Sequence, residues 1–275
     1  MTIFVNKEKV ETFNFSGGEC HVRITQDISK QRIGDATEIV AYLYSSDDVM
    51  CLLLTVNAVR KINADTEIYL TVPYFPYARQ DRVCFHGEAF SLEVMAGLIN
   101  SLECKTVTVL DPHSKVTPKL LKNCVVVSQA GLIQNTEVET VIKQEKLILL
   151  APDEGAREKT EELAKNLGVE AQYARKVRNP DTGGIMGTEI PDNVEGKKYM
   201  VVDDICDGGR TFIELGKLLK QNGASDLYLY MTHGIFSKGL DELQKYYKHV
   251  YCYHSMNENY KNSQEFLTIL EGEVR

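Results

Sequence analysis

The hydrophobic positions of the chain form a repeated pattern from about residue 37 onward. Short β-branched runs such as "EIVAYLY", "TEIYLTV" and "KKYMVV" each precede a segment whose apolar residues recur at helical spacing. The expected helices cover residues 46–62, 89–101, 115–122, 155–167, 209–222, 238–247 and 263–270. Strands that alternate with helices predict parallel sheets with helices on both faces. Two such sheets fit the chain better than one, so the expected fold class is α/β with two domains.

A polar segment, "NTEVETVIKQEK", predicts the domain boundary, because the strand–helix pattern starts again at Lys146. We therefore expect domains at 1–143 and 144–275, each with the length of a small α/β domain. The segment 176–198 differs from both, since it contains prolines and several glycines but no periodicity. Such a stretch predicts a lid, a binding loop or a disordered segment.

Composition and charge narrow the possible partners. The 275 residues carry a net charge of −8, which argues against a nucleic-acid partner, because binding to phosphate backbones needs a basic surface. Seven cysteines without a C-x-x-C motif or zinc spacing indicate reduced thiols. The start lacks the apolar core of a signal peptide, and no apolar run approaches the roughly 20 residues that span a bilayer. We expect a cytoplasmic protein with no membrane partner.

The stretch "MVVDDICDGGRTF", residues 200–212, has the order buried strand, acidic turn, glycine-rich loop and helix start. Backbone N–H groups at such a loop can bind phosphate, and carboxylates can accept hydrogen bonds from ribose hydroxyls or bind magnesium. The segment therefore predicts a site for a ribose phosphate. Its members are Asp203, Asp204, Asp207, Gly208, Gly209, Arg210 and Thr211. The alternative is that the acids only end a strand and cap a helix, but one cap accounts for one carboxylate and not for three.

A second cluster, "VPYFPYARQDR" at residues 72–82, places several donors and acceptors after a strand that ends in prolines. Arg79 can pair with phosphate, and Gln80 with Asp81 can bind the edge of an adenine. Taken alone, the four residues R-Q-D-R are more typical of a salt-bridged surface turn.

Three weaker signals gain meaning from their positions. His113 and Asp153 follow strands at equivalent places in the two halves, and together they could bind magnesium with a nucleotide, although a single His at a strand end is usually structural. Lys176 and Arg178 open the segment 176–198 and could close over a polyphosphate, but they also fit a solvated charged surface. Cys206 lies inside the glycine-rich loop with no nearby His, so we interpret it as a packing residue.

Together these segments resemble the ribose-phosphate pyrophosphokinase (phosphoribosyl pyrophosphate synthetase) family. "PYFPYARQDR" resembles the ATP-binding signature of that family, and "VVDDICDGGRTF" resembles the phosphoribosyl-binding loop that phosphoribosyltransferases share. "DPH", "APDEGA", "KVR" and "THGIFSKG" follow in the order of the family. The resemblance implies two phosphoribosyltransferase-type domains with the active site between them. It also implies a homo-oligomer, a dimer or a hexamer, in which a neighbouring subunit completes the site.

The resemblance further implies a reaction and a set of residues. An anomeric hydroxyl would attack the β-phosphorus of Mg-ATP, transfer diphosphate and release AMP. ATP would bind near Arg79 and Gln80, and Mg²⁺ near His113 and Asp153. The lid pair of the family corresponds to Lys176 and Arg178.

The N-terminal segment "FSGGE" corresponds to a family segment that holds adenine from the adjacent subunit. Phe15 and Glu19 match that segment, whereas Gly17 stands where the family has Asp.

Three departures from the family pattern concern the acceptor. Arg210 stands where the family loop, D-T-G-G-T or D-T-A-G-T, has glycine, no Q-I-Q-G-F-F stretch follows "DPH", and the lid begins with K-V-R in place of K-R-R. These changes leave ribose 5-phosphate as the first expected acceptor and ADP-ribose as the alternative. Diphosphorylation of ADP-ribose would serve NAD salvage, as in phage-encoded relatives of the family. A phosphoribosyltransferase and a non-catalytic regulatory homologue remain further alternatives.

Overall fold

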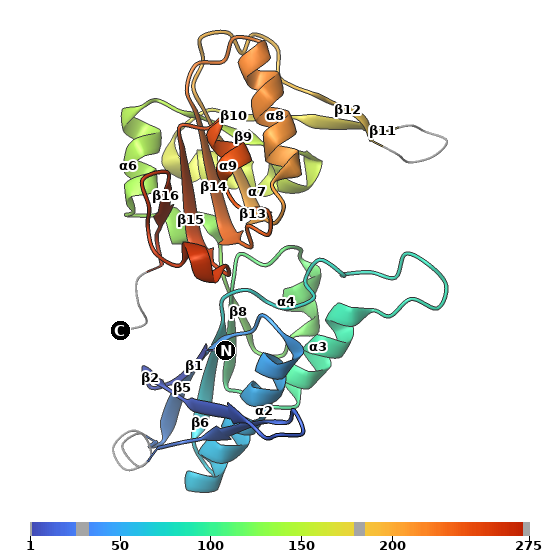
Figure 1. Cartoon of the computed structure of the whole chain (residues 1–275), viewed down its shortest axis with the longest axis vertical. Helices are drawn as coiled ribbons and strands as arrows, with labels where there is room; N and C mark the ends of the chain where they lie inside the picture. Colours follow the sequence, from blue (N-terminus) through green and yellow to red (C-terminus); the bar gives the residue numbers. More distant parts are fainter. Residues whose placement is uncertain (1, 26–32, 179–184, 272–275) are drawn as a thin grey trace. The chain divides into compact units, whose positions relative to one another are not determined.

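The computed structural model describes residues 2–25, 33–178 and 185–271, without the side chains of residues 176–178 and 185–186. The chain divides into two compact units, the first extending to Val127 and the second starting at Ser128 (Figure 1). This division lies earlier than the expected boundary at 143/144. The reason is that Ile133, Val138 and Ile142 pack into the same core cluster as Leu149 of the second unit.

The first unit contains a six-stranded sheet in the order β2-β1-β5-β6-β7-β8. Strands β5 to β8 are parallel, and β1 is antiparallel to both of its neighbours. The strands are β1 (Thr2–Val5), β2 (Glu8–Lys9), β5 (Ala36–Tyr42), β6 (Glu67–Val72), β7 (Thr106–Leu110) and β8 (Cys124–Val127). The helices are α2 (Ser46–Ile62), α3 (Ser91–Asn100) and α4 (Val116–Leu120), and a separate hairpin is formed by β3 (Glu11–Asn14) and β4 (Cys20–Arg23).

Local sequence explains where the longest helix of this unit begins. Ser45 accepts a hydrogen bond from the Asp48 backbone N–H at 3.2 Å, and the Asp48 carboxylate accepts one from the Ser45 N–H at 2.8 Å. This capping box satisfies two backbone donors that a helix start otherwise leaves unpaired. Leu52 and Val56 then follow at helical spacing and are buried in the core against the sheet.

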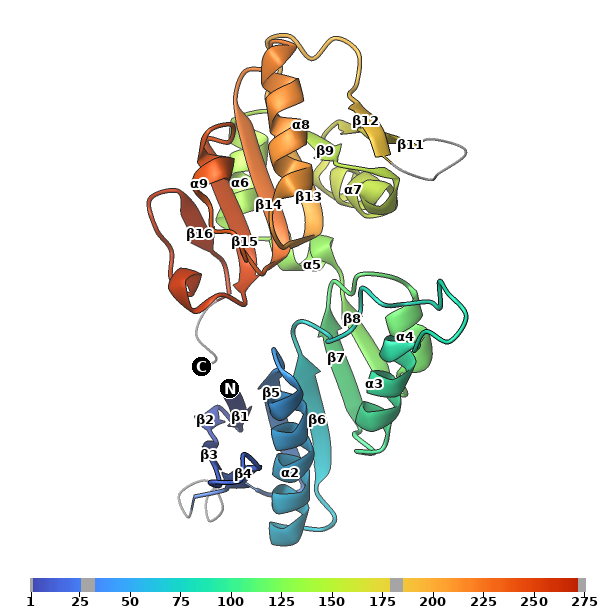
Figure 2. The same ribbon diagram turned by 45° about the vertical axis from the view of Figure 1, so that its right-hand side comes forward.

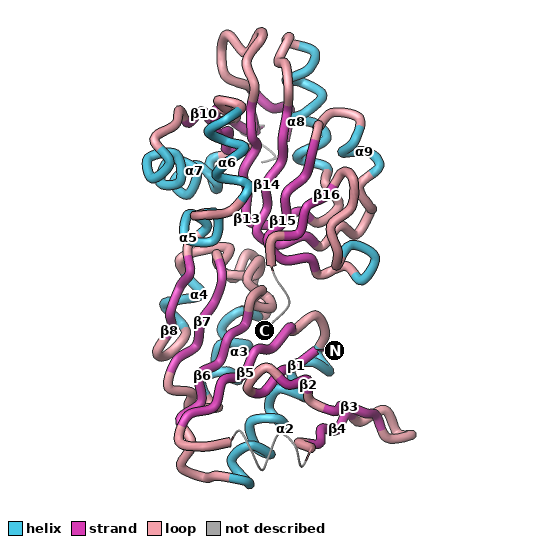
Figure 3. The backbone as a smooth tube through the Cα atoms, turned by 90° about the vertical axis from the view of Figure 1, so that its left-hand side faces the viewer, coloured by secondary structure: helices cyan, strands magenta, loops and turns pink. Residues whose placement is uncertain are grey.

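The second unit contains a six-stranded sheet in the order β10-β9-β13-β14-β15-β16, and all of its pairings are parallel. Figure 3 shows β13, β14 and β15 running side by side in it. The strands are β9 (Ile148–Ala151), β10 (Ala171–Tyr173), β13 (Tyr199–Cys206), β14 (Leu227–Gly234), β15 (His249–Ser255) and β16 (Leu267–Ile269). The helices are α5 (Gln129–Ile133), α6 (Glu137–Gln144), α7 (Glu154–Leu167), α8 (Arg210–Gln221), α9 (Asp241–Gln244) and a 3₁₀ turn, η1 (Glu258–Tyr260).

Both faces of this sheet are covered, as the apolar runs in its strands predict. On β13, Val201 packs in a cluster with Leu215 and Leu219 of α8, whereas Met200 packs in a cluster with Leu163 of α7. Figure 2 shows α8 lying along β13 and β14. The alternation of side chains along a strand thus places successive residues of β13 in two different cores.

Most of the expected helices are confirmed, and one is wrong. Residues 263–270 contain no helix, because 267–269 form strand β16, which pairs in parallel with β15 through Val250 and Leu267. The edge of β15 offers backbone partners to this segment, and a run of eight residues has no periodicity strong enough to exclude a strand. The expected helix at 238–247 is only four residues long, Asp241–Gln244. Among the described residues, no helix combines the length and hydropathy needed to cross a bilayer.

Candidate functional site

In the first unit, the loop after β6 lies next to the end of β7. Val72 pairs with Val109, and the Leu110 backbone N–H donates to the Pro73 carbonyl at 3.3 Å. Ligands of open parallel sheets bind at the carboxyl ends of strands, so both segments are correctly placed for a site.

Two buried residues hold the loop and leave its polar residues outside. Phe75 and Ala78 are each 2% exposed, and the Ala78 N–H donates to the Phe75 carbonyl at 3.4 Å. Arg79 and Gln80 follow with exposed side chains. The Gln80 carbonyl accepts a hydrogen bond from the Leu92 N–H at 3.4 Å, which ties the loop to the first turn of α3.

The neighbouring Asp81 makes a local ion pair. Its carboxylate lies 3.4 Å from Nε of Arg82, whose side chain is mostly exposed. The salt-bridged turn that the sequence left open as an alternative therefore exists at Asp81. The ion pair joins Asp81 to Arg82 and does not include Gln80, so the contact of Gln80 with adenine stays a prediction.

His113 lies three residues beyond the end of β7, with an exposed side chain. The turn that carries it is fixed by Asp111, which is 2% exposed and has a φ of 38°. The Asp111 N–H donates to the Val127 carbonyl of β8 at 2.8 Å. The backbone thus places His113 at the same sheet edge as Arg79 and Gln80.

The β3–β4 hairpin carries the two adenine candidates of the N-terminal segment. The Phe15 N–H donates to the Glu19 carbonyl at 2.9 Å, and Phe15 is 52% exposed. Its ring lies 5.5 Å from that of Phe13 and 5.6 Å from that of His21, between ring centroids. A Cβ at Gly17 would lie 3.2 Å from a carboxylate oxygen of Glu19, so a side chain here would crowd that carboxylate.

In the second unit, the acidic pair lies at the carboxyl end of β13. Gln129 of α5 donates from Nε2 to the Asp203 carbonyl at 3.0 Å, which connects the strand end to the first helix of the unit. The Asp204 N–H donates to Oδ1 of Asp203 at 2.9 Å. Asp204 is 6% exposed, and Nζ of Lys159 from α7 lies 4.0 Å from its Oδ2.

The environment of the Asp203 carboxyl disfavours its charged form. Burial raises the pKa of Asp203 well above its ordinary value, and the negative charges of Asp204 and Asp153 raise it further. Lys159 provides a positive charge near Asp204. A ligand that brings hydrogen-bond donors or positive charge to Asp203 would favour its ionised form.

The glycine-rich loop leads into the start of α8. Gly209 has a φ of 73°, a left-handed conformation that glycine adopts without strain, and no side chain caps the helix. The start of α8 lies next to half-buried Asp207 and Thr211, and a helix start of this kind can bind an anion through its backbone N–H groups. The Arg210 side chain is 90% exposed, and its Nε lies 2.7 Å from Oε1 of Glu214 in the same helix.

Asp153 has a structural role that the sequence did not reveal. Its Oδ1 accepts from the backbone N–H groups of Gly155 at 3.0 Å and Ala156 at 3.4 Å, so it caps α7. The pairing of β9 with β13 places it at the same sheet edge as Asp203. Carboxylate oxygens at this edge are suitable ligands for Mg²⁺, which usually binds only one or two protein carboxylates and completes its shell with phosphate and water.

The remaining candidates are placed as follows. Lys176 and Arg178 lie on β11 (Arg175–Arg178), which pairs antiparallel with β12 (Ile185–Glu189), so the start of segment 176–198 is a hairpin. The roles of their side chains stay predictions. Cys206 is fully buried, and burial raises the pKa of its thiol to about 12, which confirms the packing role because only a thiolate is a good nucleophile.

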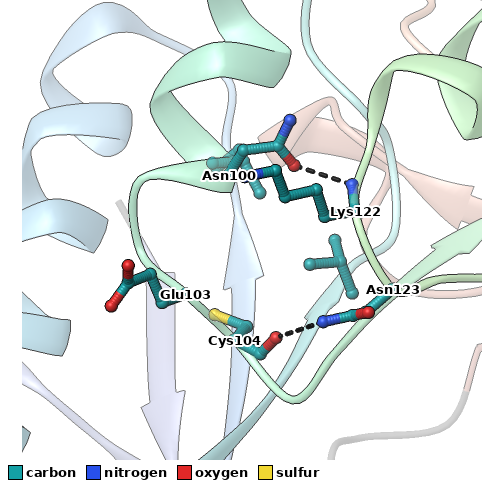
Figure 4. Close-up of a pocket in the computed structure, with 7 residues that line it drawn as sticks. Asn100, Glu103, Cys104, Lys122 and Asn123 are labelled. Atoms are coloured by element: carbon teal, nitrogen blue, oxygen red, sulfur yellow. Dashed lines mark hydrogen bonds between the residues drawn. The ribbon is translucent and has the colours of Figure 1, made fainter.

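A pocket of about 230 Å³ opens elsewhere in the first unit, near the starts of β7 and β8 (Figure 4). Its two asparagines already bind the surrounding loops, since Asn100 accepts from the Lys122 N–H at 2.8 Å and Asn123 donates to the Cys104 carbonyl at 3.1 Å. Burial raises the pKa of the Cys104 thiol to about 11. The pocket lies at the strand edge opposite to the candidate site and is not part of it.

Both units have a mostly parallel sheet with polar loops at its carboxyl edge, and in the second unit an acidic strand end precedes a helix without a side-chain cap, an arrangement that suits a phosphate ligand. The profile of the phosphoribosyl transferase domain matches residues 129–266, and that of the N-terminal domain of ribose phosphate pyrophosphokinase matches residues 2–102. The chain belongs to the ribose-phosphate pyrophosphokinase family.

Individual relatives agree with this assignment. The ribose-phosphate pyrophosphokinase of Sulfurisphaera tokodaii is 33% identical over 233 residues, which cover 83% of this chain and 77% of the relative. The ribose-phosphate pyrophosphokinase of Thermococcus kodakarensis is 31% identical over 241 residues, which cover 85% and 80%. The crystal structure of phosphoribosylpyrophosphate synthetase from Mycobacterium smegmatis has the same fold, with a TM-score of 0.78 and 22% identity over 95% of this chain and 85% of that one.

Proposed function

We propose that the protein is an ATP-dependent diphosphokinase that transfers the β,γ-diphosphate of ATP to the 1-hydroxyl of ribose 5-phosphate and releases AMP. The observation that carries the proposal is the acidic end of β13 immediately before the uncapped start of α8. A ribose 5-phosphate presents hydroxyls and a phosphate with matching chemistry. The family assignment supports ATP as the donor of the diphosphate.

The proposal assigns roles in the reaction to residues of both units. In the second unit, Asp203 and Asp204 accept hydrogen bonds from ribose hydroxyls and orient the anomeric oxygen, while the loop from Asp207 to Thr211 binds the 5-phosphate. Lys176 and Arg178 neutralise charge that develops on the transferred diphosphate. In the first unit, Arg79 contacts the nucleotide phosphates and Gln80 the adenine.

Three further residues complete the proposal. His113 and Asp153 would hold Mg²⁺, which would screen the charge of the ATP phosphates. Phe15 of the β3–β4 hairpin offers an exposed ring to an adenine of a second copy of the chain, with Glu19 beside it. On this basis the active protein is a homo-oligomer, and a fully active monomer in sedimentation analysis would contradict it.

The test measures AMP release from Mg-ATP with ribose 5-phosphate as acceptor, together with the mass of the product. We expect a product that carries a diphosphate at the anomeric position. Lys176→Ala should abolish turnover, whereas Lys165→Ala, an exposed residue of α7, serves as the matched control and should leave it unchanged. If the wild-type chain released no AMP with ribose 5-phosphate or with ADP-ribose, the diphosphokinase proposal would be rejected. Formation of a nucleotide and diphosphate from phosphoribosyl diphosphate and a nucleobase, without ATP, would indicate a phosphoribosyltransferase.

A second acceptor, ADP-ribose, is favoured by one observation. Arg210 stands at the mouth of the loop with a mostly exposed side chain, where it can reach a substituent beyond the 5-phosphate. The same assay with ADP-ribose in place of ribose 5-phosphate decides between them. Faster turnover of ribose 5-phosphate by a wide margin would reject ADP-ribose and its role in NAD salvage.

A further inference from the structure

Lys238, the lysine of the segment "THGIFSKG", has been given no role so far, and it lies directly over the glycine-rich loop. The stem of Lys238 crosses Gly208, because a Cβ at that glycine would lie 3.5 Å from Cδ, 3.6 Å from Cε and 3.7 Å from Cγ of the lysine. The ammonium group is one bond beyond Cε. It therefore lies beside the backbone that, in the function proposed above, binds the 5-phosphate.

The backbone holds Lys238 in this position. It belongs to the loop that follows β14, and the first residues of this loop are hydrogen-bonded to the end of β13. The N–H groups of Ile235 and Phe236 donate to the Cys206 carbonyl at 2.8 and 3.1 Å, and the Ser237 N–H donates to the Asp207 carbonyl at 3.2 Å. The loop with the lysine and the loop with the acids thus form one bonded unit.

A buried ring anchors the same loop. Phe236 is 1% exposed, and a Cβ at Gly234 would lie only 2.2 Å from its ring. Nδ2 of Asn257 donates to the Phe236 carbonyl at 3.1 Å. Because both sides of the turn are fixed, Lys238 needs little reorganisation to meet an anion over Gly208.

The charges of the two cations at this loop differ in availability. Arg210 is engaged by Glu214 in an ion pair within α8. In the part of the chain that the structure describes, Lys238 has no carboxylate within ion-pair distance. Asp203 and Asp204 already place two acidic side chains at this end of the sheet, so a phosphate bound here needs a compensating cation.

We propose that Lys238 is a phosphate-binding residue of the acceptor site and that it, and not Arg210, supplies the cation that compensates the 5-phosphate. This inference rests on the proposed function, since it assigns a ligand of the same acceptor site. Its substrate class is a sugar that carries a phosphate ester at O5. A lysine binds such a group as a point charge through three donors, without the planar geometry that an arginine requires.

The test is the binding of ribose 5-phosphate to the full chain by titration calorimetry, with inorganic phosphate as a second probe. Lys238→Met keeps the aliphatic stem over Gly208 and removes the charge. We expect affinity for ribose 5-phosphate to fall roughly 10-fold to 100-fold, as for loss of a charge-assisted hydrogen bond. Lys238→Arg should restore most of it, and Lys217→Met, an exposed lysine two turns along α8, should bind like the wild type.

Kinetics give an independent measure. In Lys238→Met the KM for the acceptor should rise by a similar factor, with little change in kcat or in the KM for ATP. The dependence of acceptor KM on ionic strength should also become weaker than in the wild type, because one charge contact is lost. A merely structural role would instead change both KM values or the thermal stability.

The outcomes separate the two proposals. If Lys238→Met binds ribose 5-phosphate as tightly as the wild type, Lys238 is not a ligand and this inference fails while the diphosphokinase stands. If the wild type binds ribose 5-phosphate and Lys238→Met does not, but no AMP is released, the inference stands and the proposed reaction fails. If Arg210→Met weakens phosphate binding as much as Lys238→Met, the assignment of the compensating cation to Lys238 alone is overturned.

Discussion

Replacement of Asp203 by Asn should make the folded protein more stable while it removes activity. Asn has nearly the shape of Asp, and its amide oxygen can still accept the 2.9 Å hydrogen bond from the Asp204 N–H. What it removes is a carboxyl group whose pKa is raised by burial and by the charges of Asp204 and Asp153. Unfavourable charge at a binding site commonly lowers the stability of the fold while it serves function.

The size of the effect follows from electrostatics. Two like charges about 5 Å apart repel by roughly 3 kcal/mol at an effective dielectric constant of about 20. The raised pKa of Asp203 lessens this repulsion, and Lys159, 4.0 Å from Asp204, offsets another part of it. We therefore expect Asp203→Asn to gain ~1–2 kcal/mol at pH 7, equivalent to an increase in Tm of ~2–8 °C.

The effect should depend on pH with a defined sign. The folded pKa of Asp203 is raised above its ordinary value of 3.8, so the unfolded chain releases this proton at lower pH than the folded chain. The folded state then binds more protons, and the stability of the wild type falls as the pH rises above about 4. Asp203→Asn lacks this group, so its advantage should be small at pH 4 and should grow toward neutral pH.

The assay is thermal unfolding of the full chain followed by calorimetry between pH 4 and pH 7, with AMP release measured on the same samples. Two Tm curves that run parallel over this range would refute the argument, because they would show that Asp203 ionises in the folded protein as it does in the unfolded one. A stabilised variant with unchanged AMP release would instead leave the electrostatics intact and remove Asp203 from the acceptor site.

Two further stability predictions test other parts of the second unit. The hydrogen bond from Lys248 at 3.0 Å lowers the pKa of Asp226, so Asp226→Asn should lower the free energy of unfolding by a few tenths of a kcal/mol at pH 7. This loss should vanish as the pH falls below the ordinary Asp pKa. A loss that persisted at low pH in calorimetry would exclude the ion pair as its cause. Gly234→Ala would place a Cβ 2.2 Å from the Phe236 ring and 2.8 Å from Cys252 Sγ, so we expect the free energy of unfolding in denaturant to fall by ~1–3 kcal/mol. Gly187→Ala is the control and should change stability little, because its Cβ would meet no neighbouring residue within 4 Å among those described. Equal stability of both variants would contradict the close packing at Gly234.

Much of the candidate site could be predicted because its chemistry is local. The acids, glycines and helix start of residues 203–211 are contiguous, so their order alone indicates an anion site at a strand end. The same applies to the loop at residues 73–82, where prolines end the strand. The capping residue Ser45 likewise marks the start of α2 without any tertiary information.

Other features had no local signal. Nothing in the sequence near Lys159 or Lys238 indicates that one lies 4.0 Å from Asp204 and the other over Gly208, because these contacts arise from neighbouring strands and helices of the folded sheet. Residues 267–269 form a strand because they pair with the edge of β15, which the apolar pattern of the eight residues 263–270 does not encode.

The sequence by itself thus determined the alternation of strands and helices, the α/β class and the residue types of the site, since backbone propensity and hydrophobic spacing act over a few residues. Only the tertiary structure decided the strand order, the domain to which residues 128–143 belong, and the charges that surround Asp203 and Gly208. The physical reason is that burial and electrostatics depend on residues far apart in the chain, which meet only when the parallel strands align their carboxyl ends at one edge.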